Sequence, residues 1–319
     1  MKISFLQAGN GDCIHIESEE HHVIIDSGEV CNELVSVVES IKAKKEVIDL
    51  LVITHYDTDH IKAINTILEN LNVEDRKKLV KKVWFNATKV GFHGNEKLLS
   101  EQDATKLAYL LLEADINWIS ELRTGEIEKI DDNLTLEVIE GGEIYQQIRE
   151  GKLLGNEKLD WDTSFKELEQ YMDDEVLDES KTNAQSTIII VHTQGKKILL
   201  PGDATPEKLA KALDEYRKDS IIKFDLVKLP HHGSYKNITK EILNKIESSN
   251  YMISTNGMKY FHPNKKMMLK ILRWGKRCDD EKMQFHLNYY DELYKKLNIA
   301  DIDKLQYKFE CDGKRTFEF

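Results

Sequence analysis

The stretch 48–54, IDLLVIT, is apolar almost throughout and runs directly into the polar block THYDTDH. An apolar run of this length is typical of a strand that is buried on both faces of a sheet. Helical apolar spacing precedes it at 31–44 and follows it at 61–71, and the alternation continues with strand VWFNA, a helix at 104–113 and strand INWIS. Repeated β-α-β units predict a layered α/β protein in which helices cover a sheet.

Short strands are predicted on both sides of this region. Residues 3–26 contain three strand patterns separated by turn residues, which predicts a β-meander. Strands EIEKI and LTLEVIE follow Gly125, and we expect a second sheet to begin later, where TIIIVHT and KKILLPGD pair as a hairpin. Helices are predicted at 206–216 and 265–274. Residues 277–319 predict a C-terminal helix and a closing β-hairpin, YKFEC-DG-KRTFEF.

The charge of the chain is unevenly distributed. The 319 residues carry a formal net charge of −12, which argues against a protein that holds duplex DNA across a broad basic face. Between Glu143 and Ser180 there are twelve acidic side chains against four basic ones. We interpret 143–181 as an acidic insertion in a single domain spanning 1–319. A solvated acidic flap is the favoured interpretation, and the alternatives are a lid, a plug that mimics DNA, or a docking surface for a protein partner.

Cysteine spacing and hydropathy limit the cellular context. The four cysteines, Cys13, Cys31, Cys278 and Cys311, form no C-x-x-C pair, so neither a zinc knuckle nor a disulfide framework is predicted. The N-terminal sequence lacks the basic and apolar regions of a secretory signal, and no apolar run approaches the ~18 residues that span a bilayer. These patterns predict a cytoplasmic protein with no membrane partner.

The block THYDTDH places His55, Asp57, Asp59 and His60 within six residues, directly after the apolar strand. The carboxyl edge of a sheet is where α/β folds gather ligand sites. An aspartate alone at this place would be interpreted as a helix N-cap. Two flanking histidines favour a metal site instead, because imidazole and carboxylate are common ligands of divalent metals.

Three further polar blocks follow predicted strands. LLPGDAT places Asp203 between a strand and a helix, KLPHHGS places His231 and His232 in a glycine-containing turn, and STNGMKYFHPN places His262 before a proline. A Gly-Asp junction alone is weak evidence for a functional site, because Asp is a common N-cap residue and Gly is a common turn residue. Since each block lies where a strand ends, we expect all of them to converge on one rim.

In this order, FLQAGNGDC, THYDTDH, LLPGDAT, VKLPHHGS and YFHP make the chain similar to the metallo-β-lactamase superfamily. The blocks most closely resemble those of the hydrolase domain of ComEC-type DNA-uptake proteins. The resemblance runs from about Ile3 to the C-terminal strands, with 143–181 as an apparent insertion. It implies an αββα sandwich, in which two mixed β-sheets are flanked by helices and a metal site lies at one edge between them.

The resemblance also implies a role for each residue of the site. His55 and Asp57 would bind one divalent metal, Asp59 and His60 the other, Asp203 would bridge both, and His232 would complete the second site. Asp26, in VIIDSG, matches a buried acid that orients ligand histidines.

Two positions depart from the pattern of the superfamily. Asp57 stands where many members have His, which adds a hard oxygen donor and favours manganese or magnesium more than an all-histidine zinc site would. The chain has TNAQS where most members have a His, so Asn183 or a water is expected as the ligand there. His93 is a further candidate, although a surface-loop residue is the favoured interpretation, and His192 is expected to be an outward strand residue. We therefore expect two divalent ions, manganese or zinc, with magnesium as a further alternative.

These expectations together predict a metal-dependent phosphodiesterase or nuclease acting on a phosphodiester such as single-stranded nucleic acid or a nucleotide. A hydroxide activated by both metals would attack phosphorus at a centre that includes Asp59. His231, Ser234 and Lys228 would neutralise charge on the phosphate oxygens, and His262 would donate a proton to the leaving group. For Ser234 and Lys228 the alternatives are a turn hydroxyl and an exposed strand end.

Two other functions remain open at this point. The same metals could hydrolyse a non-phosphate ester or a lactone. The protein could also be a metal-stabilised module without activity, whose acidic insertion binds a partner protein.

Overall fold

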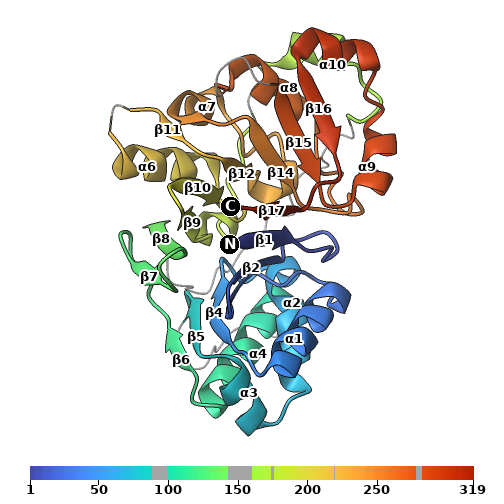
Figure 1. Ribbon diagram of the computed structural model, residues 1–319. Helices are drawn as coiled ribbons and strands as arrows, with labels where there is room; N and C mark the ends of the chain where they lie inside the picture. The colour runs from blue at the N-terminus through green and yellow to red at the C-terminus, as the bar shows by residue number, and fades with distance from the viewer. Residues whose placement is uncertain (88–98, 143–159, 174–175, 219, 278–281) are drawn as a thin grey trace.

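The computed structural model describes residues 1–87, 99–142, 160–173, 176–218, 220–277 and 282–319. Among these residues, two large mixed sheets lie face to face, and helices cover the outer face of each (Figure 1). This arrangement confirms the predicted αββα sandwich. Phe5, Leu50, Trp84, Val191 and Met252 are among the side chains that fill the layer between the sheets.

The first sheet is built mainly from the N-terminal part of the chain. Its strands are, in spatial order, β17 (Thr316–Glu318), β1 (Lys2–Phe5), β2 (Ile14–Ser18), β3 (His21–Ile25), β4 (Ile48–Ile53), β5 (Lys82–Phe85) and β6 (Asn117–Ile119). Pairing is antiparallel from β17 to β3 and parallel from β3 to β6. The predicted meander is confirmed, and all six residues of β4 are buried as expected for a central strand.

Helices α1 (Asn32–Lys44), α2 (Thr58–Glu69), α3 (Val73–Leu79) and α4 (Leu99–Glu113) belong to the outer side of the first sheet (Figure 1). Leu34, Ile64 and Leu107 are among the side chains that pack against it. The sequence pattern did not indicate α3, because its seven residues, VEDRKKL, are mostly charged.

The second sheet contains, in spatial order, β16 (Phe309–Asp312), β15 (Met283–Leu287), β14 (Asn250–Ile253), β12 (Leu226–Lys228), β10 (Lys196–Leu200), β9 (Ile188–Thr193), β8 (Thr135–Glu140) and β7 (Ile127–Lys129). Pairing is parallel from β16 to β10 and antiparallel from β10 to β7. The predicted hairpin of β9 and β10 is confirmed. Strands β11 (Ile222–Lys223) and β13 (Ile246–Glu247) form a small separate pair.

The outer layer of the second sheet consists of α5 (Phe165–Leu168), α6 (Pro206–Tyr216), α7 (Lys240–Lys245), α8 (Lys265–Trp274), α9 (Tyr290–Leu297) and α10 (Asp301–Tyr307). Short 3-10 helices are η1 (Glu169–Tyr171), η2 (Asn183–Gln185) and η3 (Pro230–Gly233). The bounds of α6 and α8 agree with the predicted helices. No helix in the described ranges is long and apolar enough to span a bilayer. Cytoplasmic location stays a prediction.

The second sheet begins earlier in the chain than predicted. Strands β7 and β8 precede the acidic insertion, yet β8 pairs antiparallel with β9, which follows it. The expectation that this sheet starts after the insertion is therefore wrong. Local patterns show where strands lie, whereas a pairing across some 50 residues of chain depends on the tertiary fold.

The predicted C-terminal β-hairpin is also wrong. Strand β16 pairs parallel with β15 in the second sheet, and β17 pairs antiparallel with β1 in the first. The Asp312-Gly313 turn thus carries the chain from one sheet to the other. Phe309 of β16 packs under the outer helices, whereas Phe317 of β17 packs between the sheets. The two strands therefore contribute to different hydrophobic cores. The same segment holds α9 and α10 where one helix was expected.

The described part of the acidic insertion is folded into the second half of the sandwich. Phe165 is completely buried, and Trp161 and Leu168 lie in the same core. The carboxylate of Asp160 accepts hydrogen bonds from the first backbone amides of α8, at Lys265 (3.0 Å) and Lys266 (2.8 Å). A solvated flap is therefore the wrong description of residues 160–173, because they complete a core and cap a helix.

We predict that Gly11→Ala destabilises the protein. The turn between β1 and β2 packs against the start of α2, where a β-carbon on Gly11 would overlap the backbone carbonyl of Asp59. Backbone cannot move aside as a side chain can, so we expect the free energy of unfolding to fall by about 3 kcal/mol, measured by urea denaturation. Gly195→Ala is the control. A β-carbon at this position meets no atom within 4 Å, so the free energy of unfolding should fall by only about 1 kcal/mol, which is the cost of a positive φ for alanine. Equal losses in both variants would contradict this explanation.

Candidate metal centre

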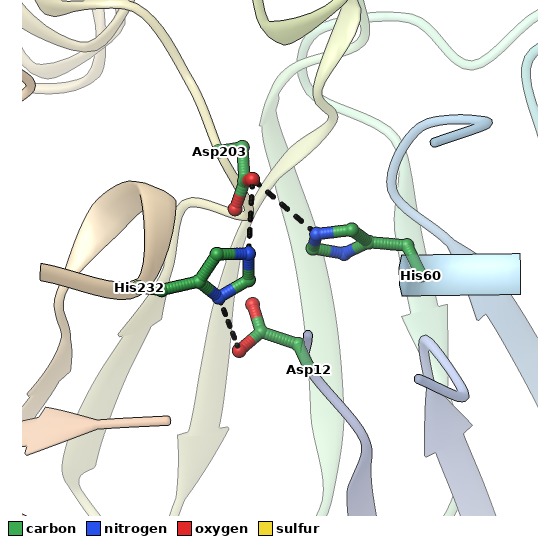
Figure 2. Close-up of side chains that lie close together, drawn as sticks. All are labelled: Asp12, His60, Asp203 and His232. Atoms are coloured by element: carbon green, nitrogen blue, oxygen red, sulfur yellow. Dashed lines mark ion pairs between the residues drawn. The ribbon is translucent and has the colours of Figure 1, made fainter. Parts of the chain in front are cut away.

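The polar blocks of the sequence meet at one edge of the sandwich. Asp12 lies in the turn before β2, His60 in the first turn of α2, Asp203 after β10, and His232 in η3 after β12. One ligand atom from each of these four buried side chains lies within 4.8 Å of every other. Figure 2 shows the four side chains pointing toward one another from both halves of the molecule. The expected convergence of the strand ends is therefore present.

Asp203 lies at the middle of this cluster. Its Oδ2 is 3.3 Å from Nε2 of His60 and 3.3 Å from Nε2 of His232. The Nε2 atoms of His55 and His231 lie 4.0 Å from the same oxygen. Four imidazole rings thus present the same nitrogen to one carboxylate, which is where a residue shared by two cations would lie.

Two histidines of the cluster have an unusual backbone. His231 (φ 46°) and His232 (φ 54°) both lie in the left-handed region, between Pro230 and Gly233. Residues other than glycine rarely adopt this conformation, and it costs about 1–3 kcal/mol where it is enforced. The turn brings both rings to the same side, and the centres of the rings are 5.8 Å apart.

Asp26 orients the two histidines of the THYDTDH block. Its carboxylate accepts hydrogen bonds from the backbone amide (2.8 Å) and the hydroxyl (2.7 Å) of Thr54, and lies 2.8 Å from Nδ1 of His60. The Thr54 hydroxyl oxygen is 3.1 Å from Nδ1 of His55. Fixing Nδ1 in this way leaves Nε2 of each ring directed at the centre, which is how acids orient metal-ligating histidines.

His232 is held in the same manner by different partners. Its Nδ1 lies 3.1 Å from the backbone oxygen of Ser254, and its Nε2 faces Asp203 and also Oδ2 of Asp59 at 3.3 Å. Asn10 donates a hydrogen bond to that oxygen of Asp59 at 3.2 Å. Asp59 therefore lies on the His232 side of the cluster.

Asp57 lies on the His55 side. Its Oδ2 is 3.6 Å from Nε2 of His55, and its side chain is one third exposed. Asp57 holds the N-cap position of α2, yet among the described residues its carboxylate accepts no capping hydrogen bond. Asp57 is therefore an N-cap by position only, and capping does not occupy its carboxylate.

The electrostatics of the cluster favour a positive charge at its middle. Burial pushes the pKa of Asp203 upward, but His232, His60 and His231 hold it well below its ordinary value. Burial likewise opposes the charged forms of His60 and His232, yet Asp203 raises the pKa of each well above its ordinary value. A site that stabilises imidazolium so strongly is one in which a divalent cation would also be stabilised.

Several polar atoms in this cluster also lack a hydrogen-bond partner. Nε2 of His55, His60 and His232 and Oδ1 of Asp12 and Asp203 are buried and have no hydrogen-bond partner among the described residues. Buried polar atoms in native proteins are nearly always paired, so five of them together require a further group. Nitrogen and carboxylate oxygen are the ligands that divalent transition metals accept, and the residues present therefore fit such ions.

Asp12 and Lys228 form a buried ion pair beside the centre. The Lys228 Nζ contacts Oδ2 of Asp12, donates a hydrogen bond to the Gly202 carbonyl (3.1 Å), and lies 3.7 Å from Oδ1 of Asp203. Burial would raise the pKa of Asp12, but Lys228 and His232 lower it to about 2. The alternative of an exposed strand end for Lys228 is wrong, because the residue is completely buried.

The sequence analysis assigned no role to Asp12, although this residue is the acid of the GNGD sequence in the first of the five blocks. That acid was the signal that could have identified it.

Asp178 was also missed, and no local pattern marks it. Its Oδ2 lies 3.2 Å from Nδ1 of His231 and accepts hydrogen bonds from the amides of Asn183 (2.7 Å) and Asn237 (2.8 Å). Asp178 thus does for His231 what Asp26 does for His60. The Asn183 amide is committed to Asp178, and its predicted role as a metal ligand stays a prediction.

The other predicted residues lie as follows. Ser234 is buried, and its hydroxyl oxygen accepts a hydrogen bond from the Lys236 amide at 3.3 Å. His262 is completely buried, with its ring centre 4.9 Å from that of His231. His192 is partly exposed on β9, where Nε2 lies 2.7 Å from a Glu137 oxygen. His93 lies outside the described residues.

Solved structures similar to this chain include the metallo-beta-lactamase fold protein YhfI from Bacillus subtilis, at 11% identity, 99% coverage of each chain and a TM-score of 0.46. Igni18, a metallo hydrolase from Ignicoccus hospitalis, has 14% identity, 100% coverage of each chain and a TM-score of 0.44. Zn²⁺-bound PqqB from Methylobacterium extorquens has 10% identity, with 88% of this chain and 98% of that chain covered and a TM-score of 0.42. No curated protein matches the sequence.

The family model described as the Metallo-beta-lactamase superfamily matches residues 6–257. That range includes Asp12, the THYDTDH block, Asp203 and His232, all of which lie in the candidate metal centre. The chain therefore belongs to the metallo-beta-lactamase superfamily, a superfamily of metal-dependent hydrolases.

Proposed function

We propose that this protein hydrolyses phosphodiester bonds with the help of two divalent cations. The observation that carries the proposal is the position of His231. Its Nε2 faces the cluster, 4.0 Å from Asp203, while Asp178 holds its Nδ1. Burial opposes the charged form of this ring, but Asp203 and Asp178 raise its pKa above the ordinary value. A cationic donor beside the metal ligands suits a substrate that carries negative charge before it reacts.

The cations would be held by residues from both halves of the sandwich. His55 and Asp57 would hold one ion, with Asn183 or a water as a further ligand, and Asp59, His60 and His232 the other, with Asp203 shared between them. Bound divalent cations lower the pKa of water and neutralise charge on phosphoryl oxygens. The carboxylates supply hard donors, which favours manganese, with zinc and magnesium as competitors.

The chain's own residues bind and orient the phosphate. His231 would donate a hydrogen bond through Nε2 to a non-bridging oxygen, and Ser234 stays a predicted contact beside it. We assign Lys228 to positioning, because its ammonium is buried against Asp12 and Gly202 and keeps Asp12 ionised. Burial and His231 hold the pKa of His262 well below its ordinary value, which favours a neutral packing role over the predicted proton donation.

Three finer expectations remain part of the proposal. The ComEC-type resemblance rests on the five ordered sequence blocks. A single-stranded nucleic acid or a nucleotide is the expected substrate, and a digestion panel of single-stranded DNA, duplex DNA, RNA and cyclic dinucleotides identifies it. A protein partner at the acidic insertion stays a prediction.

The first prediction from this proposal concerns the bond that is cleaved. With manganese, the protein should hydrolyse bis-p-nitrophenyl phosphate, and it should do so much less after removal of metal with a chelator. p-Nitrophenyl acetate carries the same leaving group on a neutral ester and serves as the control substrate. Turnover of the acetate alone would replace the phosphodiesterase proposal with that of an ester or lactone hydrolase. Turnover of neither would favour the metal-stabilised binding module.

The second prediction concerns metal binding. Asp203→Asn removes the central carboxylate charge, and we expect the affinity for Mn²⁺, measured by isothermal titration calorimetry, to fall by more than about 100-fold. Asp214→Asn is the matched control, because this carboxylate is exposed on α6 and pairs with Lys245. If both variants bound manganese as the wild type does, Asp203 could not be the shared ligand.

The third prediction concerns Asp178. Asp178→Asn should lower kcat/KM for the phosphodiester by about 10–100-fold, because the imidazole of His231 loses its orienting carboxylate. In a His231→Ala background the same change should have little further effect, since the two residues act as a unit. Asp173→Asn, an exposed acid of the same segment, is the control. Additive losses in the double variant would show that Asp178 does not act through His231.

A further inference from the structure

The loop between β14 and α8 presents aromatic side chains at the surface. Tyr260 is 59% exposed and Phe261 45% exposed, and Met258 in the same loop is 72% exposed. The next residue, His262, is completely buried. Large apolar side chains side by side on the surface of a soluble domain commonly mark a binding site.

The backbone of this aromatic pair is also unusual. Tyr260 and Phe261 both have φ of 57°, in the left-handed region that residues other than glycine rarely adopt. Within the described residues, His231 and His232 form the other consecutive pair of non-glycine residues with this conformation, and they lie in the candidate metal centre. Unfavourable backbone persists mainly where the surrounding structure enforces it, and such positions cluster at functional sites.

The aromatic pair lies next to the metal centre. The Tyr260 ring centre is 6.3 Å from that of His262, which in turn is 4.9 Å from His231. Partial burial raises the pKa of Tyr260, and the nearby carboxylates of Asp59 and Asp57 raise it further. A group bound at His231 would therefore have Tyr260 within reach of its neighbouring atoms.

The acidic insertion contacts this loop and the start of α8. Trp161 packs edge-on against Phe261 at 6.5 Å and donates a hydrogen bond from its indole nitrogen to the Pro263 carbonyl at 2.7 Å. Asp160 caps the first amides of α8, directly after the loop. Both contacts restrain the loop, so the rings form a positioned surface.

We propose that Tyr260 and Phe261 form a stacking platform for a base next to the scissile phosphodiester, so that the substrate is single-stranded nucleic acid. This inference rests on the proposed phosphodiesterase function. Aromatic side chains stack on bases whatever the sequence, and a duplex keeps its bases inside the helix where the platform cannot reach them.

Stacking would also explain how a chain with a net negative charge binds a nucleic acid. The net charge is −12, and Lys259, the cation between Met258 and Tyr260, is already paired with Glu29. Coulomb attraction over a broad surface is therefore weak, whereas stacking does not depend on net charge.

The test compares two labelled strands of equal length, an oligothymidylate and an abasic strand of tetrahydrofuran residues, with manganese present. The wild type should cleave the oligothymidylate with the higher kcat/KM. Tyr260→Leu and Phe261→Leu should each reduce that preference about ten-fold, mainly through KM, because a stacked base is lost. Tyr260→Phe keeps the ring and should keep the preference. Tyr109→Leu, which removes a 63% exposed ring on α4, is the control for surface substitution.

The outcomes separate this inference from the function on which it rests. Equal cleavage of both strands by the wild type, or a preference that both Leu variants retain, overturns the platform and leaves the phosphodiesterase intact. Hydrolysis of bis-p-nitrophenyl phosphate with neither strand cleaved also overturns it. Failure to hydrolyse any phosphodiester removes the proposed function, and the platform falls with it. Calorimetry with Mn²⁺ verifies that the loop variants keep the metal centre.

Discussion

A buried carboxylate surrounded by imidazole nitrogens is the constraint on which the rest of this structure depends. Asp203 is 3% exposed, and four Nε2 atoms lie 3.3 to 4.0 Å from one of its oxygens. Such a carboxylate is costly to bury unless cations compensate it. Burial opposes the charged forms of His60 and His232, but Asp203 raises the pKa of each well above its ordinary value, and divalent ions could supply the same positive charge. Bound ions would also explain the buried atoms around Asp203 that lack a hydrogen-bond partner, because those atoms would face the ions.

The sandwich positions this centre by holding each ring from behind. Asp26 and Thr54 belong to the first sheet and fix His55 and His60, whereas Ser254 and Asp178 hold His232 and His231 on the second. Lys228 links the halves, because it extends from β12 to Asp12 in the turn before β2. The site exists only when both sheets are packed together, so the apolar layer between them supports its geometry.

The acidic insertion connects the outer core to the site in two places. Near its middle, Trp161 and Asp160 hold the loop that carries His262 and the exposed aromatic pair. Near its end, Asp178 holds His231. Its net negative charge suggested a solvated segment, but the charge count could not show that Phe165 and Trp161 anchor it in the core. The two buried aspartates used in these contacts are indistinguishable in sequence from the exposed acids around them.

The sequence by itself determined the layered α/β class, the central strands and the residues that follow their carboxyl ends, because apolar periodicity and short polar blocks are local properties. His55, Asp59, His60, Asp203 and His232, which the sequence singled out, accordingly lie close together in the structure. The tertiary structure alone decided that β8 pairs with β9, that β16 and β17 belong to different sheets, and that Asp12, Lys228 and Asp178 lie beside the centre. Those features depend on contacts between segments far apart in the chain, for which a local pattern carries no information.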